Sequence, residues 1–92
     1  MIECDNRQCR IAGAITVDRV GKMLQVLKLH LVGKITELDF SGVDTVDSSV
    51  LALIFSCLRD AQGQGRSLHL TGLPASVMTL ADLYGVASLL QA

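Results

Sequence analysis

Apolar and polar positions follow two different periods along the chain, and these periods predict its strands and helices. Short apolar stretches at 1–4 and 8–12 flank Asp5–Arg7, where an Asp-Asn pair favours the turn of a β-hairpin. Behind Thr16, which can cap a helix, apolar residues recur at spacings of three and four: Val17, Val20, Leu24, Leu27 and Leu31. This stripe predicts a first helix that packs on a sheet and ends at Gly33.

The middle of the chain predicts a strand, a loop and a second helix. Ile35–Phe40 has the composition of a buried strand, and a polar loop follows it. The helix is expected to begin at Asp47 or Ser48 and to end at Gly63-Gln64-Gly65, because glycine closes a helix at low cost. Its residues are apolar over more than one face, which is more than a simple surface helix requires.

The last third predicts one more strand and a third helix. Residues 67–71 alternate, so Leu68 and Leu70 face one way and His69 the other. Pro74 stands near the first position of a helix that ends at Gly85, and 86–90 form a further apolar turn or helix. The order strand, strand, helix, strand, helix, strand, helix indicates right-handed crossovers onto a largely parallel sheet, and therefore an α/β fold.

Composition narrows the classes of function. A chain of 92 residues is expected to form one domain over 1–92, with an aliphatic core because only three residues are aromatic. Such a small aliphatic domain is also expected to bury apolar surface against a partner. The net charge of −1 and the scattered basic residues argue against nucleic acid. The longest apolar run is too short to span a membrane and no leader segment is evident, so we expect a soluble cytoplasmic protein.

The cysteines and histidines give no support for a metal site. Cys4, Cys9 and Cys57 form no Cys-x-x-Cys pair and are odd in number, which favours reduced thiols; a Cys4–Cys9 bridge across the hairpin is the alternative. His30 and His69 are far apart and lie near no cysteine pair. We expect neither a metal nor any other cofactor.

The start of the second helix is the candidate functional site. The first turn of a helix has backbone N–H groups without partners and a partial positive charge, so a phosphoryl group on Ser48 or Ser49 would be well placed. The alternative is that Asp47, Ser48 and Ser49 only cap the helix.

Catalysis has little support in the sequence. A serine nucleophile needs a base within reach, and the two histidines fall at the end of the first helix and in a strand. The sequence leaves open whether His69 approaches Ser48 in space. No Walker-type loop or dinucleotide fingerprint occurs, so we expect a protein that is not an enzyme.

Two segments resemble the STAS domain, the fold of bacterial anti-sigma factor antagonists and of the small cytoplasmic subunit of Mla phospholipid-transport ABC systems. The first is Leu38–Val43 followed by Val46–Leu53, with its Asp-Ser-Ser helix start; the second is Leu68–Pro74 with Leu80–Val86. The resemblance covers nearly the whole chain. It implies a small, mostly parallel sheet of about four to five strands with an N-terminal hairpin and about three to four helices.

The resemblance implies that Ser48 is the position phosphorylated in antagonists and placed at the ATPase contact in the transporter subunit. Antagonists usually have Gly-Leu-Gly after the serines, whereas this chain has Val50-Leu51-Ala52. That departure favours the transporter branch, and the larger Val50 is expected to hinder close approach of an anti-sigma kinase.

Two partners are therefore expected as alternatives. The first is the ATPase of a lipid-transport ABC complex, with the membrane involved only indirectly through that complex. The second is an anti-sigma factor kinase that is released when Ser48 is phosphorylated. The expected interface contains Asp47, Ser48, Ser49, Val50, Leu51, Ile54 and Tyr84. Val50, Leu51 and Ile54 are included because apolar residues of the second helix exceed what one face needs. For Tyr84 the alternative is packing against Val86 and Leu89 within the monomer.

Overall fold

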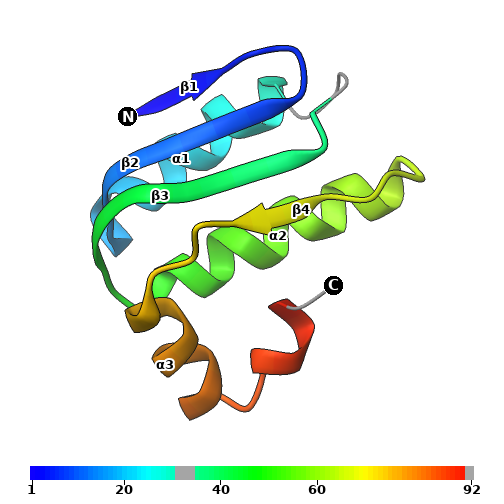
Figure 1. The fold of residues 1–92 in the computed structure, drawn as a ribbon. Coiled ribbons are helices and arrows are strands. Elements are labelled where there is room, and N and C mark those ends of the chain that lie inside the picture. The colour runs from blue at the N-terminus through cyan, green and yellow to red at the C-terminus, as the bar shows by residue number, and fades with distance from the viewer. Residues whose placement is uncertain (31–34, 91–92) are drawn as a thin grey trace.

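The computed structural model describes residues 1–30 and 35–90, which form a four-stranded sheet with helices (Figure 1). In chain order the elements are β1 (Ile2–Cys4), β2 (Gln8–Ile15), α1 (Val17–His30), β3 (Glu37–Val46), α2 (Ser49–Gly63), β4 (His69–Thr71), α3 (Ala75–Leu83) and the short 3₁₀ helix η1 (Ala87–Leu90). The predicted α/β class and order of elements are confirmed. The predicted end of the first helix, with Leu31 and Gly33, lies outside the described residues.

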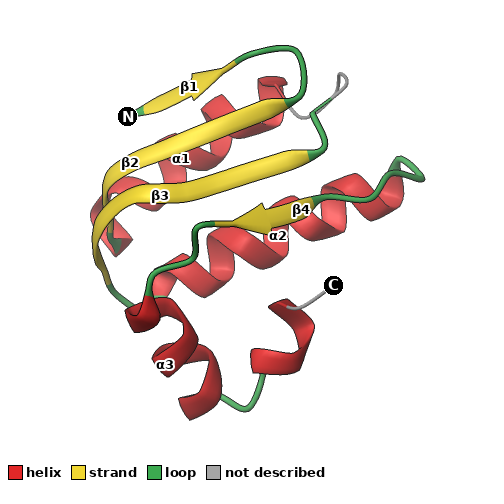
Figure 2. Ribbon diagram, in the orientation of Figure 1, coloured by secondary structure: helices red, strands yellow, loops and turns green. Residues whose placement is uncertain are grey.

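The sheet is mixed and mostly parallel. Its strands lie in the order β1-β2-β3-β4; β1 is antiparallel to β2, and β2, β3 and β4 run parallel. α1 connects β2 to β3 and α2 connects β3 to β4, as expected of parallel strands. Both long helices lie along the same side of the sheet (Figure 2). Within residues 1–30 and 35–90, no helix is long and apolar enough to cross a membrane.

β3 is longer than the sequence predicted. It continues past Phe40 to Val46, through the residues expected to form a polar loop, because this part keeps pairing with β2 as far as Ile15. The register shifts twice along the pair. At one shift Gly42 allows a close approach, since a Cβ there would lie 2.9 Å from the Cβ of Ala12. The extension carries the chain directly to the start of α2.

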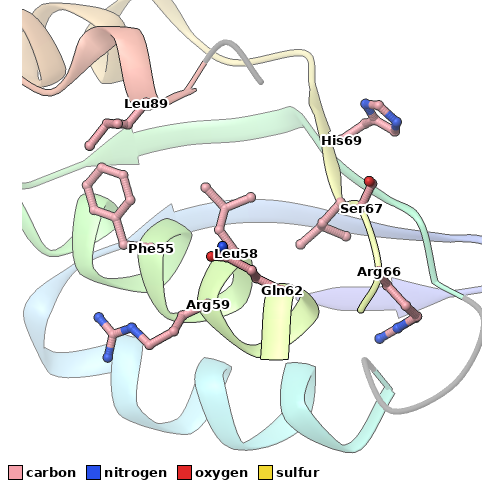
Figure 3. Close-up of a pocket in the computed structure, with 9 residues that line it drawn as sticks. Phe55, Leu58, Arg59, Gln62, Arg66, Ser67, His69 and Leu89 are labelled. Carbon is pink, nitrogen blue, oxygen red and sulfur yellow. The ribbon is translucent and has the colours of Figure 1, made fainter. Parts of the chain in front are cut away.

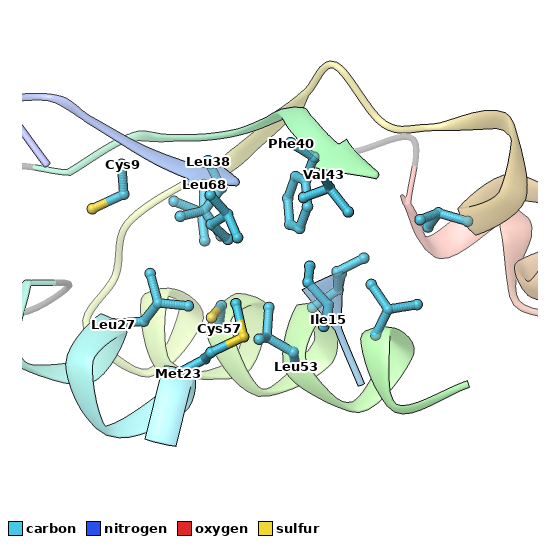
Figure 4. Packing of buried hydrophobic residues seen from close by; sticks show 14 of the residues in the cluster. Cys9, Ile15, Met23, Leu27, Leu38, Phe40, Val43, Leu53, Cys57 and Leu68 are labelled. Carbon is cyan, nitrogen blue, oxygen red and sulfur yellow. The ribbon is translucent and has the colours of Figure 1, made fainter. Parts of the chain in front are cut away.

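The hydrophobic core lies between the sheet and its two long helices. Leu38, Phe40 and Val43 of β3 face Met23 of α1 and Leu53 of α2 (Figure 4). The remaining buried apolar side chains extend this layer; they include Ile11, Ile15, Leu27, Leu68, Val77 and Leu90.

Val17, the first residue of the predicted apolar stripe of α1, is exposed, whereas the others that the structure describes are at least half-buried. Leu27 is buried and Val20 and Leu24 are half-buried, as predicted, but Val17 is 74% exposed. Val17 is the first residue of the helix, whereas the buried residues of α1, Met23 and Leu27, lie in its later turns. Its hydrophobicity is therefore not explained by the core.

The hydrophobicity of α2 is explained by burial inside the monomer. Its buried residues are Val50, Leu51, Leu53, Ile54, Cys57 and Ala61. The helix packs on the sheet and also contacts α1 and α3, so more than one of its faces is covered. The apolar character of these six positions therefore does not require a partner protein.

The hairpin contains a disulfide, so the prediction of reduced thiols at its two cysteines is wrong. The register of β1 and β2 places Cys4 directly opposite Cys9, and the two sulfur atoms are bonded. The bridge across the hairpin, which the sequence left as the alternative, is the one that the structure contains, and the choice depends on the register. Cys57 is free and buried, and burial together with Asp60 raises the pKa of its thiol to about 12. Cys57 is thus an inert core residue.

A matched pair of glycine substitutions tests the connection between β3 and the turn after β4. Gly72 has φ +65°, and a Cβ there would lie 2.8 Å from the Ser41 nitrogen and 2.9 Å from Asp39 Oδ1. We expect Gly72→Ala to lower the free energy of unfolding by about 1–3 kcal/mol, measured by urea denaturation. Gly21→Ala is the control, because a Cβ at that position in α1 meets no atom within 4 Å. It should stabilise by about 0.5–1 kcal/mol. Equal effects of the two substitutions would contradict this account.

Candidate functional site at the start of α2

Ser48 lies between the end of β3 and the first turn of α2. It occupies the N-cap position with φ −62° and ψ −17°, and its side chain makes no capping hydrogen bond. The residue is exposed, and its carbonyl oxygen accepts the Leu51 N–H in the first turn of the helix. A hydroxyl in this place is open to a partner or a modifying enzyme.

The Asp47 carboxylate holds the backbone on both sides of the site. Its Oδ1 accepts hydrogen bonds from the Ser49 N–H, at 2.9 Å, and from the Ser49 hydroxyl. Its Oδ2 accepts the N–H of Val17, the first residue of α1, also at 2.9 Å. One side chain therefore caps the N-termini of two helices.

The hydrogen bonds around Asp47 favour its charged form. The Ser49 hydroxyl contributes most, followed by the N–H groups of Val17 and Ser49, and together they hold the pKa of the Asp47 carboxyl below its usual value. The carboxylate is therefore negative at neutral pH. It lies one residue from Ser48, so a phosphoryl group added there would meet both the positive end of α2 and a negative neighbour.

Capping accounts for two of the three polar residues at this junction. Asp47 and Ser49 bond to each other and to the helix starts, as the structural alternative expected. Ser48 has no such role, although it stands at the position where a serine would normally cap. Its hydroxyl is the group for which capping provides no explanation.

Three residues of the expected interface belong to the core instead. Val50 and Ile54 are fully buried and Leu51 is 7% exposed, so none of them presents a surface to a partner. The argument that Val50 hinders a kinase is wrong for the same reason, because its side chain points into the monomer. Tyr84, at the end of α3, is 58% exposed and remains available.

Val17 is a neighbour of the site that was not predicted from the sequence. It lies thirty residues from Asp47 in the chain, yet its N–H is bonded to that carboxylate and its side chain is exposed. The predicted parallel order of the strands could have indicated it. Parallel strands end at the same edge of a sheet, so the helices that follow β2 and β3 begin side by side.

The geometry separates the serine from the histidine that could have activated it. His69 pairs with Glu37 at the start of β3, whereas Ser48 follows the end of that ten-residue strand. The two therefore lie at opposite ends of the sheet and form no nucleophile–base pair. In the part of the chain that is described, no group of three or more His, Cys, Asp or Glu residues could hold a metal ion.

The capping role of Asp47 predicts a pH-dependent loss of stability. Because folding lowers the Asp47 pKa, its contribution is present above the unfolded-state pKa and is lost as the pH falls through the folded-state value. We expect Asp47→Asn to have a lower free energy of unfolding than the parent protein at about pH 7. This difference should become smaller below about pH 4. Urea denaturation across that range measures it. Asp44→Asn, at an exposed position of β3, is the control and should leave stability unchanged. A gap that is independent of pH would contradict the role.

Comparison with known proteins gives one family and one fold. A model of the family described as "Mlab, STAS domain" matches residues 5–91. No curated protein matches the chain in sequence. Matching solved structures include the anti-sigma factor antagonist SpoIIAA in its unphosphorylated form, with a TM-score of 0.73 and 16% identity over 96% of this chain and 82% of that one. At this identity the likeness concerns the fold alone, and it confirms the expected STAS architecture.

Since the family model covers almost the whole chain, this protein belongs to the Mlab-type STAS domain family.

Proposed function

We propose that this chain is a non-enzymatic cytoplasmic subunit that binds and regulates the ATPase of a phospholipid-transport ABC complex. The observation that carries the proposal is the exposed Ser48 hydroxyl, which stands at a helix start without serving as its cap. The match to the Mlab-type family model supports this branch of the STAS proteins.

The proposed contact surface combines a fixed polar centre with exposed apolar side chains. Ser48 touches the partner directly, while Asp47 and Ser49 are engaged with each other and position it. Val17 and Tyr84 are exposed and extend the surface on α1 and at the end of α3. A partner that binds one conformation of an ATPase better than another shifts its population toward that conformation, which is how a subunit without chemistry can regulate turnover. The subunit is linked to the membrane only indirectly, through the transporter complex.

An anti-sigma factor antagonist is the second candidate, supported by the fold shared with SpoIIAA. In this case a kinase would modify Ser48 and the added charge would end the contact. The phosphoryl group is favoured locally by the start of α2, but it would place a second negative charge beside Asp47 and within the interface. Because Val50 is buried, its size favours neither candidate.

Replacing Ser48 by a large charged residue tests the proposed contact. We expect Ser48→Glu and Ser48→Arg to abolish co-purification with the ABC ATPase, because either side chain introduces an unpaired charge at the centre of the interface. Thr36→Glu is the control: Thr36 is exposed and precedes β3, at the opposite end of the sheet. Binding and ATP turnover that stay unchanged in both Ser48 variants would refute the proposal.

Intact-mass analysis separates the two candidates. After incubation with candidate anti-sigma kinases, stoichiometric addition of one phosphate that is lost in Ser48→Ala would favour the antagonist. If no kinase modifies the protein while the ATPase still co-purifies with it, the transporter subunit is favoured. The Ser48→Ala variant should fold normally, because the hydroxyl caps nothing.

A further inference from the structure

A groove of about 610 Å³ lies between the C-terminal half of α2, the start of β4 and η1 (Figure 3). It is at the end of α2 remote from Ser48, so it is separate from the proposed ATPase contact. Its lining residues come from these three elements and from the turn between α2 and β4: Phe55, Leu58, Arg59, Gln62, Arg66, Ser67, Leu68, His69 and Leu89.

The interior of the groove is apolar and open to solvent. Phe55 and Leu58 of α2 are only half-buried, and Leu89 of η1 is 58% exposed. Figure 3 shows Leu89 above Phe55, with Leu58 between them and the start of β4. All three line the same groove, and covering their exposed apolar area by another chain would be favourable.

The rim of the groove is basic. Arg59 is exposed on one side of it, whereas the His69 ring points away from the groove. Arg66 is fixed at a second point, because its Nη1 donates to the Ile35 carbonyl oxygen at 2.9 Å and its Nη2 to Gln64. Among the described residues, no Asp or Glu lines the groove. Its charge is therefore complementary to a carboxylate.

The edge of the sheet beside the groove has backbone groups available for pairing. Within the described sheet β4 has one neighbour, β3. The His69 N–H donates to the Thr36 carbonyl oxygen on the β3 side, at 2.8 Å. Because the Leu68 C=O is trans to that N–H and alternate residues of a parallel strand direct their peptide groups to the same side, the Leu68 C=O and the N–H and C=O of Leu70 point away from β3.

We propose that this groove and the β4 edge bind an extended, acidic and apolar peptide segment of a partner protein, which pairs with β4 as an added strand. Its backbone bonds to Leu68 and Leu70, one apolar side chain packs on Phe55 and Leu89, and a carboxylate meets Arg59. The outward peptide groups select a polypeptide rather than a lipid, since only a polypeptide backbone matches their alternating donors and acceptors. Because β4 is short, the side-chain contacts must supply much of the affinity.

Selection from a random heptapeptide library displayed on phage tests this site with the whole protein as bait. We expect enrichment of peptides that alternate apolar residues and contain Asp or Glu. Their synthetic versions should shift the amide signals of residues 67–71 in NMR titrations. Substituting proline at the centre of a peptide, or lysine for its acidic residue, should weaken binding at least about tenfold, because strand pairing or the charge contact is lost.

Two exposed positions allow the groove to be changed without disturbing the core. We expect Arg59→Glu and Leu89→Asp each to reduce peptide affinity about tenfold or more, whereas Lys22→Glu, on the exposed face of α1, should not. The proposal is overturned if no peptide is enriched, if enriched peptides bind Arg59→Glu equally well, or if the amide shifts lie elsewhere. Sedimentation that shows dimers lost in Leu89→Asp would overturn it in favour of a second copy of this chain. None of these outcomes bears on Ser48 and the ATPase.

Discussion

The organisation of this protein depends on one carboxylate. β2 and β3 run parallel and end together, with Ile15 opposite Val46, so the helices that follow them begin at the same edge of the sheet. Two helix starts placed together concentrate unpaired N–H groups and partial positive charge. Asp47 satisfies both the N–H groups and the positive charge, because its one negative carboxylate accepts the first N–H of α1 and of α2. Ser48 is left at the surface in a backbone conformation that its neighbours fix.

The face of the sheet opposite the helices is stabilised by polar contacts between strands. Gln8 on β2 donates to Glu37 on β3, and the Thr71 hydroxyl on β4 donates to the same carboxylate. Arg10 pairs with Asp39, whose pKa is lowered chiefly by the Ser41 N–H and hydroxyl and further by Arg10. These side chains alternate with the buried residues of the same strands, so one sheet presents an apolar side to the helices and a hydrogen-bonded side away from them.

The sequence could predict what depends on local patterns. The hairpin, the order of elements, the glycine stops after α2 and α3 and the orientation of Leu68 and His69 all follow from period and turn chemistry, and the structure confirms them. It could not predict what depends on contacts between distant residues. The extension of β3 is due to pairing with β2, and the choice between free thiols and a Cys4–Cys9 bond depends on the register of the hairpin.

The predictions about the candidate site differ in the same way between local and distant features. The resemblance of the Asp-Ser-Ser segment to the STAS family located the junction at residue 48, and that residue is exposed there. The apolar residues after it were assigned to a partner because the sequence does not show how many neighbours surround α2. Val17 could have been found from the parallel order of β2 and β3, because it begins the helix that follows β2 at the same edge of the sheet.

The length of α2 has a consequence for how signals can be combined. Its fifteen residues span about 22 Å as a single rigid rod, with a hydroxyl at one end and an open groove at the other. A small tilt of the rod against the sheet moves both ends at once and in opposite directions. Two ligands that favour different tilts would change each other's affinity by an equal factor, as thermodynamic linkage requires.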